Sequence, residues 1–167
     1  MSTQDAGRAF VFGDNVDTDI LAPGLYMKKP IEEMARHTLE ALDPAFATTV
    51  RAGDIVVGGD NFGMGSSREQ AVMTLRTLGV AAVIARSFAG LFFRNALNLG
   101  LPALACPEAG KIRAGDRLAV APEDGRIDNL TRNETYACEP IPPHLAEMIR
   151  DGGLLPHLEK KLKRRPT

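Results

Sequence analysis

The sequence predicts a mixed α/β fold with a parallel βαβαβ core and an added β-hairpin. Between residues 51 and 106, short apolar runs alternate with helical patterns, and strands joined through helices pair in parallel by right-handed crossovers. After residue 109 the pattern changes to alternating segments around an Asp-Gly turn at 124–125, which favours an antiparallel hairpin. The length of 167 residues fits a single domain over 1–167, with a core at about 8–145 and a helical tail over 143–165.

The spacing of apolar residues separates strands from helices along the chain. Alternating or short apolar runs predict strands over 8–13, 51–59, 80–85 and 101–106. Helical spacing, with early acids or a closing glycine, predicts helices over 31–42, 67–78 and 88–100. The tail predicts two short helices broken at Gly152-Gly153, and the segments 14–19 and 21–30 are expected to be loops.

Composition and charge exclude several classes of function. A net charge of −1 provides no basic field for nucleic acid, and the KKLKRR run at 160–165 is expected to be a solvated helix end. No segment approaches the roughly 18 apolar residues that cross a membrane, and the first ten residues lack a signal-peptide pattern. We therefore expect a cytoplasmic protein with no membrane or nucleic-acid partner.

The cysteines and histidines predict no metal site within this chain. Cys106 and Cys138 belong to no CxxC pattern, and two thiolates are too few for an iron–sulfur cluster. They could pair, although buried thiols are favoured in a cytosolic protein. The three histidines show no metal-ligand spacing, so any metal would have to come from elsewhere.

The glycine- and serine-rich segment at 58–70, GGDNFGMGSSREQ, is the main candidate for a functional site. It lacks the lysine of a Walker A loop, and GMGSSR departs from the GxGxxG dinucleotide pattern. A capping box with Ser66 or Ser67 at the N-cap would explain one serine and one acid, but not the four glycines or a second serine beside Arg68. Free N–H groups at a helix start, together with an arginine, would instead bind an anion and favour ionisation of a serine. Both interpretations stay open.

Three motifs, in this order, resemble the mobile fourth domain of the aconitase superfamily: DNVDTDIL at 14–21, PGLYM at 23–27 and GSSRE at 65–69. RSFAGLFFRNALNLGLP at 86–102 is similar to the second helix of the same domain. As a separate chain of this size, the sequence resembles the family of 3-isopropylmalate dehydratase small subunits over about residues 8–145. This resemblance implies a swivelling β/β/α domain that completes the active site of a large subunit carrying a 4Fe–4S cluster.

The resemblance also implies a role for each matching residue. Ser66 would be the base that removes a carbon-bound proton, and Ser67 and Arg68 would hold a substrate carboxylate, with Gly65 beside them. Asp19 would pair with a histidine of the large subunit; without the resemblance, an Asx turn is the expected role of Asp19. The implied reaction is dehydration of a 2-hydroxy diacid and rehydration at the neighbouring carbon, in leucine biosynthesis. The iron of the partner's cluster would polarise the leaving hydroxyl. A heterodimer and a heterotetramer both fit.

The loop after Pro-Gly sets substrate choice in this family, with an apolar residue for isopropylmalate and an arginine for homoaconitate. Here Tyr26 and Met27 are followed by two lysines. Lys28 could meet a third carboxylate as a point charge, or point to solvent while Leu25 and Met27 line an apolar pocket. Isopropylmalate is favoured, and homoaconitate, 2,3-dimethylmalate and citraconate/maleate stay open.

Two other classes of function are alternatives to a hydro-lyase subunit. One is a non-catalytic anion-binding module that shares only the fold, and the other is a structural assembly subunit. In the helix predicted over 88–100, Arg94 and Asn95 are expected to make a helix-face salt bridge and a cap within the domain, rather than to contact substrate.

Overall fold

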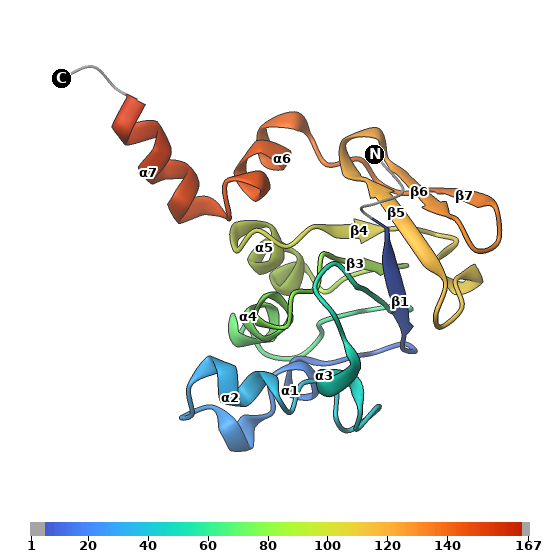
Figure 1. Cartoon of the computed structure of the whole chain (residues 1–167). Helices are drawn as coiled ribbons and strands as arrows, with labels where there is room; N and C mark the ends of the chain where they lie inside the picture. Colours follow the sequence, from blue (N-terminus) through green and yellow to red (C-terminus); the bar gives the residue numbers. More distant parts are fainter. Residues whose placement is uncertain (1–5, 165–167) are drawn as a thin grey trace.

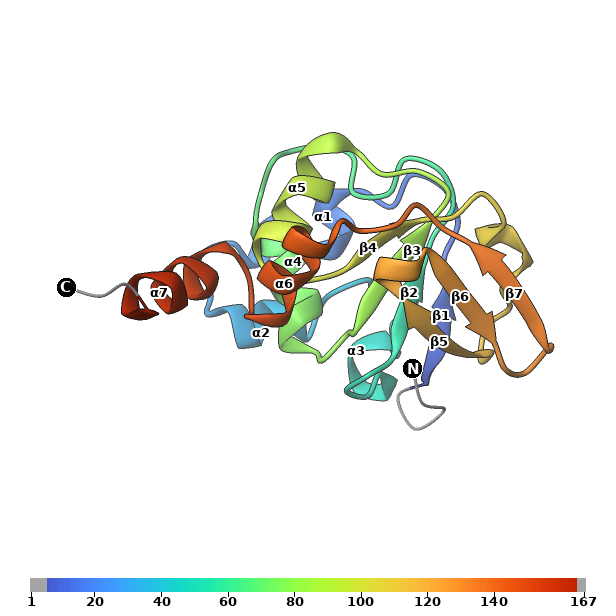
Figure 2. The same cartoon turned by 90° about the horizontal axis from the view of Figure 1, so that it is seen from above.

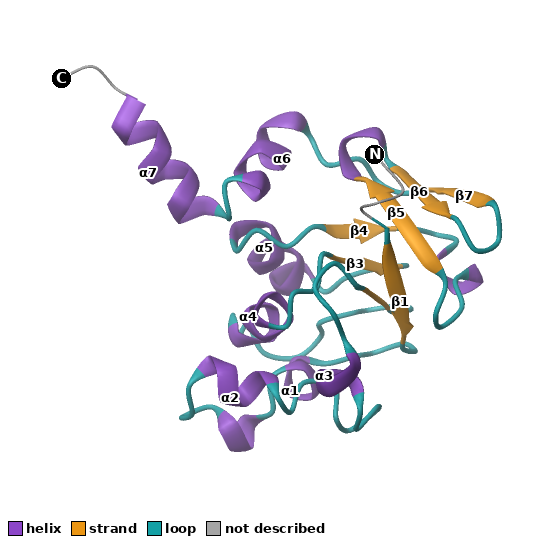
Figure 3. Ribbon diagram, in the orientation of Figure 1, coloured by secondary structure: helices purple, strands orange, loops and turns teal. Residues whose placement is uncertain are grey.

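The computed structural model describes residues 6–164 of the chain. In chain order, its helices and strands are β1 (Gly7–Val11), α1 (Thr18–Leu21), η2 (Gly24–Tyr26), α2 (Ile31–Ala35), α3 (Phe46–Thr49), β2 (Ile55–Val57), α4 (Gln70–Thr77), β3 (Ala82–Ala85), α5 (Gly90–Asn98), β4 (Ala103–Ala105), η3 (Ala109–Lys111), β5 (Arg117–Ala121), η4 (Pro122–Asp124), β6 (Arg126–Asn129), β7 (Glu134–Ala137), α6 (Pro143–Arg150) and α7 (Leu154–Arg164). The helices gather on one side of the molecule and the strands on the other (Figure 1 and Figure 3).

The strands form one seven-stranded mixed sheet with the order β4-β3-β2-β1-β5-β6-β7. Strands β1 to β4 pair in parallel, which confirms the predicted βαβαβ core. Strand β5 pairs antiparallel with β1, and β5, β6 and β7 form an antiparallel meander. The predicted hairpin is therefore present, closed by Gly125 in the left-handed region at φ 64°, and it gains a third strand that the sequence pattern did not predict.

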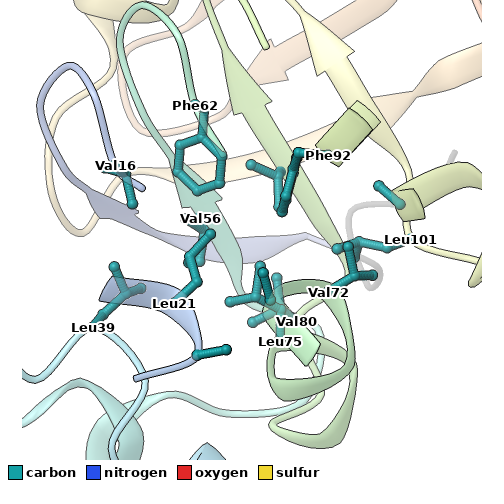
Figure 4. Close-up of a cluster of buried hydrophobic side chains, with 14 of the residues drawn as sticks. Val16, Leu21, Leu39, Val56, Phe62, Val72, Leu75, Val80, Phe92 and Leu101 are labelled. Atoms are coloured by element: carbon teal, nitrogen blue, oxygen red, sulfur yellow. The ribbon is translucent and has the colours of Figure 1, made fainter. Parts of the chain in front are cut away.

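Alternate residues of the parallel strands pack into cores on opposite faces of the sheet, because successive side chains of a strand point in opposite directions. Val56 and Val83 join one cluster, together with residues from helices α1, α4 and α5. Figure 4 shows this cluster, with Val56 lying near Phe62 and Leu21. Ile55 and Ile84 join the other cluster, with residues of strands β5 to β7 and helix α6. The sheet is thus covered on both faces, as its apolar strands predict.

Helix α2 is much shorter than predicted, so the expectation of a helix over 31–42 is wrong in its second half. The helix ends at Ala35, and Leu39 lies in the left-handed region with φ 62°. The buried Leu39 donates its backbone N–H to the carbonyl oxygen of Ile20 at 3.0 Å. An apolar residue in this conformation cannot continue a helix, so a tertiary contact overrides the local helical pattern.

The other helices keep their predicted positions with shorter ends. The helices expected over 67–78 and 88–100 are α4 and α5, and the expected loops hold two short turns of helix, α1 and η2. The tail breaks at Gly152 and Gly153, whose φ angles are 99° and 121°, as predicted. Between residues 6 and 164, no helix is long and apolar enough to cross a membrane.

Helix α7 extends away from the rest of the molecule (Figure 1 and Figure 2). Its leucines at 155 and 162 are 72% and 65% exposed. The basic residues at 161, 163 and 164 are exposed, in agreement with a solvated helix end, and Lys160 forms an ion pair with Asp151 at 2.9 Å. Arg165, the last residue of the basic run, lies outside the described residues.

The two cysteines are free and buried, as favoured from the sequence. Both belong to the core cluster shared with strands β5 to β7. Burial raises the pKa of the Cys106 thiol, and burial together with the neighbouring Cys106 raises the pKa of Cys138 to about 11. Both groups therefore stay protonated near neutral pH, and a protonated thiol is a poor nucleophile.

We expect Cys106 and Cys138 to resist labelling by a thiol reagent in the folded protein at pH 8, and to react fully after unfolding in guanidinium chloride. The measurement is the absorbance change with a disulfide reagent. A Leu155→Cys variant, which places a thiol on the exposed side of α7, serves as the positive control and should label rapidly at one site. Rapid labelling of the parent protein would contradict the described burial.

Candidate active site

The loops that leave the carboxyl ends of β1 and β2 run side by side beyond the sheet. The N–H of Gly63 donates to the carbonyl oxygen of Val16 at 2.7 Å, and the N–H of Thr18 donates to that of Met64 at 2.9 Å. Asp17 and Met64 form an isolated parallel bridge within this pairing. The DTD and GSSRE motifs, far apart in sequence, are thereby brought together at the edge of the sheet where open α/β folds bind ligands.

The hydroxyl of Ser66 faces polar side chains rather than the end of a helix. Its Oγ accepts a hydrogen bond from Arg68 Nε at 2.9 Å and lies 3.2 Å from Thr18 Oγ1. Its backbone N–H also donates to Thr18 Oγ1, at 3.1 Å. Ser66 itself is exposed, so its hydroxyl is held in place yet open to a ligand.

The structure does not contain the capping box considered as one of the two interpretations of this segment. Helix α4 begins at Gln70, and its N-cap residue is Glu69, which makes no side-chain capping bond. Ser66 and Ser67 lie outside the helix, so neither occupies the position from which a side chain can cap the first turn. Of the two interpretations that the sequence left open, capping is therefore removed and a site for an anion stays.

Arg68 connects Ser66 with Asp19. Its Nη1 donates to Asp19 Oδ1 at 3.2 Å and to the carbonyl oxygen of Ala22 at 2.9 Å, while its Nε donates to Ser66 Oγ. Nη2 has no partner among residues 6–164. An arginine fork has five N–H donors, so this one can hold the two site residues and still offer donors to a carboxylate.

Asp19 is an exposed carboxylate held from two sides. Its Oδ1 accepts from the N–H of Gly24 at 2.8 Å and from Arg68. The Gly24 N–H and then Arg68 lower the pKa of Asp19 below its ordinary value, because both stabilise the charged form. The Asx turn considered for Asp19 is not its role here; the neighbouring Asp17 makes the local bond, accepting from the N–H of Ile20 at 2.8 Å.

An arginine braces the loops behind the site. Arg86, which follows β3, forms ion pairs with Asp14 at 3.0 Å and with Asp60 at 3.1 Å. Asp14 also accepts from the N–H of Asp60 at 2.7 Å. The loops after three neighbouring parallel strands are thus joined to one another.

A Cβ at any of the four glycines of the candidate segment would meet a neighbouring side chain closely, and two of the four also have positive φ angles. Gly63 has φ 84°, and a Cβ there would overlap the ring of Phe92. Gly65 has φ 106°, and a Cβ would lie 3.0 Å from Thr18 Oγ1. Both backbone conformations favour glycine. The glycine backbone was expected to face a ligand, but at Gly63 the missing side chain leaves space for the ring of Phe92.

Ser67 is exposed, and its carbonyl oxygen accepts a hydrogen bond from Asn95 Nδ2 at 3.0 Å. Asn95 thus acts within the domain, as expected, although it anchors the serine loop from the middle of α5 rather than capping a helix. Arg94 is exposed and makes no ion pair within residues 6–164, so the expected helix-face salt bridge is not seen.

In the loop after Pro23-Gly24, Tyr26 and Met27 are partly buried, whereas Leu25, Lys28 and Lys29 are exposed. The Tyr26 ring stacks on His37 with 3.7 Å between centroids, and Met27 packs against the core. Leu25 is 84% exposed, and Lys28 is exposed as well. Leu25 and Met27 therefore do not form a closed pocket within this chain.

Sequence reasoning missed one polar residue of the site. Thr18 is only 3% exposed and contacts both the N–H and the Oγ of Ser66. The only sequence feature that could have indicated Thr18 is its position between the two aspartates of the DTD motif, in a segment expected to be a loop.

The fold and the arrangement of these motifs define a class of protein. Residues 16–109 match the aconitase C-terminal domain family, and the chain belongs to this family. The predicted membership of the aconitase superfamily is confirmed.

The relatives are small subunits of dehydratases, which are hydro-lyases. The chain is 47% identical over 159 residues to the 3-isopropylmalate dehydratase small subunit of Moorella thermoacetica, covering 94% of this chain and 96% of that one. It is 48% identical to 3-isopropylmalate dehydratase small subunit 1 of Archaeoglobus fulgidus, covering 95% and 99%. It is 46% identical to the isopropylmalate/citramalate isomerase small subunit of Methanocaldococcus jannaschii, covering 93% and 94%.

A solved structure confirms the fold class. The crystal structure of 3-isopropylmalate dehydratase from Methanocaldococcus jannaschii superposes with a TM-score of 0.89 at 40% identity and covers 95% of each chain. The seven-stranded mixed sheet with its helices is thus the architecture of the aconitase C-terminal domain.

We expect the Asp19 carboxyl to titrate below its ordinary pKa of 3.8, and an Arg68→Gln substitution to move the midpoint upward. The upward direction follows because the guanidinium stabilises the charged form; the Gly24 N–H still keeps part of the depression. The measurement is the pH dependence of the Asp19 side-chain carbon shift by NMR. Arg51→Gln, at the opposite end of β2, is the matched control. An unchanged midpoint in Arg68→Gln would contradict the Arg68–Asp19 pair.

Proposed function

We propose that this chain is the small subunit of a hydro-lyase that interconverts 2-isopropylmalate and 3-isopropylmalate, with Ser66 as the base. The observation that carries the proposal is the position of Ser66 Oγ, 2.9 Å from Arg68 Nε and away from any helix cap. A serine serves as a base only when its alkoxide is stabilised, and a guanidinium donor stabilises that charge. The names of the relatives point to the same reaction.

In the proposed reaction, the Ser66 alkoxide removes the proton from the carbon next to a substrate carboxylate. The C–H electron pair forms the carbon–carbon double bond, and the hydroxyl of the neighbouring carbon leaves as water, taking a second proton from an acid that we assign to the large subunit. Ser66 holds the abstracted proton and returns it when water adds back with the opposite orientation. Arg68, through Nη2, and the exposed Ser67 hydroxyl bind the carboxylate, beside the backbone at Gly65.

We assign two further needs of the reaction to a large subunit. Lewis-acid assistance to the departing hydroxyl would come from a 4Fe–4S cluster on that subunit; the only thiols of this chain, Cys106 and Cys138, are buried in the core and cannot ligate one. The second need is enclosure. Ser66 and Asp19 are both exposed, so a second protein surface must cover the substrate. The exposure of the Asp19 carboxylate supports its assignment as the partner of a histidine on that subunit.

We further propose that residues 1–167 act as one domain of a cytoplasmic heterodimer or heterotetramer in leucine biosynthesis. The exposed, pre-arranged half-site supports this assembly, since it exposes functional groups that are useful only against a partner. A structural subunit lacks a use for the Ser66–Arg68–Asp19 arrangement. An anion-binding module would use Arg68, but it has no use for the exposed Asp19 carboxylate, which carries the same charge as the anion.

We expect Ser66→Ala to lower turnover of the complex with its large subunit by about 10²- to 10⁴-fold, because a positioned base contributes that much. The measurement is the ultraviolet absorbance of the unsaturated diacid after anaerobic reconstitution of iron and sulfide. Ser67→Ala, one residue away and equally exposed, is the control: its main effect should be a higher KM. Co-purification verifies assembly. Activity of Ser66→Ala within a few-fold of the parent would refute the base assignment.

Substitutions of Lys28 test which diacid is the substrate. We expect Lys28→Ala to change isopropylmalate turnover by less than about fivefold, because a solvent-exposed charge facing an apolar substituent contributes little. A homoaconitate-type tricarboxylate, a dimethylmalate and a citraconate/maleate pair complete the panel. Efficient turnover of the tricarboxylate by the parent, lost in Lys28→Ala and kept in Lys28→Arg, would make homoaconitate the substrate instead. In that alternative, Lys28 would meet the third carboxylate of the substrate.

A further inference from the structure

Thr18 lies beneath the proposed base and contacts it twice. It is 3% exposed, and it is fixed by its own N–H, which donates to the carbonyl oxygen of Met64 at 2.9 Å. Its Oγ1 accepts from the N–H of Ser66 at 3.1 Å and lies 3.2 Å from Ser66 Oγ. Gly65 makes room for this approach, since a Cβ there would lie 3.0 Å from the same hydroxyl oxygen.

We infer that Thr18 is a positioning residue whose hydroxyl donates a hydrogen bond to Ser66 Oγ when the serine is an alkoxide. This inference rests on the proposed function of Ser66. A threonine hydroxyl has one proton to donate and two lone pairs to accept with. The Ser66 N–H occupies one lone pair in either state, which leaves the proton of Thr18 free to turn toward Ser66 Oγ.

The direction of the contact depends on the charge of the serine. A neutral Ser66 has its own proton and can donate it to Thr18. An alkoxide has none, so the Thr18 hydroxyl rotates about its C–O bond and becomes the donor, without any movement of heavy atoms. Arg68 Nε is the other donor, at 2.9 Å. Two hydrogen bonds to the charged form favour that form more than one does.

The surrounding charges do not compete for this role. Asp17 and Asp19 flank Thr18 in sequence, but the Oδ1 of Asp17 accepts from the N–H of Ile20 at 2.8 Å and that of Asp19 from the N–H of Gly24 at 2.8 Å and from Arg68. From the serine loop itself, the charged neighbours are Arg68 and the exposed Glu69. Among residues 6–164, the side chains that contact Ser66 Oγ are the hydroxyl of Thr18 and the guanidinium of Arg68. A β-branched side chain with a restricted χ1 angle suits this fixed position.

The test compares Thr18→Val, which keeps the shape and removes the hydroxyl, with Thr18→Ser, which keeps the hydroxyl. Both are assayed as the complete complex with the large subunit, using 2-isopropylmalate over a range of pH. We expect Thr18→Val to lower kcat by roughly 10- to 100-fold, the effect of losing a hydrogen bond to a charged group. The rising limb of kcat/KM should move to higher pH by roughly one to two units, because the alkoxide is then harder to form. Thr18→Ser should keep the parent limb, and KM should change little in both.

Each outcome separates this inference from the function on which it rests. An active parent, an inactive Ser66→Ala and a Thr18→Val with unchanged kcat and pH limb would overturn the role of Thr18 and leave the base assignment intact. Equal losses in Thr18→Ser and Thr18→Val, with an unmoved limb, would show a packing role and overturn it as well. A parent complex that turns over no diacid overturns both proposals. If Thr18→Val fails to co-purify with the large subunit, Thr18→Ala is measured in its place with the same expected shift.

Discussion

The site depends on the backbone pairing that continues from β1 and β2 into the two loops beyond them. After Val11 and Val57, the last paired residues of the strands, hydrogen bonds recur along the loops until Thr18 meets Met64. This continued pairing places the two motifs in register, and a slip by one residue would turn Thr18 away from Ser66. Val56 of β2 packs in one core and Ile55 and Val57 in the other, so the strand from which the serine loop extends is held by packing on both faces of the sheet.

Electrostatics at that edge is organised by guanidinium groups with several partners each. Arg68 links a serine, a carboxylate and a backbone carbonyl, and Arg86 links two carboxylates from different loops. Exposed ion pairs of this kind add little to the free energy of unfolding. Their value lies in geometry, because a planar fork fixes the relative positions of its acceptors. The candidate site is therefore arranged within the chain, and in the proposed function a second protein surface would exclude water from it.

The parallel core was predictable because each βαβ unit is local in sequence and its strands are continuously apolar. Residues with distant partners were less predictable. Leu39 leaves the helical path to bond Ile20, and the antiparallel pairing of β5 with β1 joins segments about a hundred residues apart. At the site, residue chemistry alone indicated the serine segment as an anion site, but only the resemblance implied separate roles for Ser66 and Ser67. The capping interpretation failed because α4 begins at Gln70, beyond both serines. The role of Thr18 could not be predicted from local sequence, because its hydroxyl contacts a serine 48 residues away in the chain.

The exposed residues of the loop after Pro23-Gly24, which is proposed to select the substrate, have a consequence for how such subunits diversify. Leu25 and Lys28 face outward, while the links that order the serine, the arginine and Asp19 involve neither side chain. Under the proposed function, mutations at these two positions after gene duplication would leave the residues proposed for proton removal undisturbed. A change of diacid would then need only a few codons and would retain the same fold.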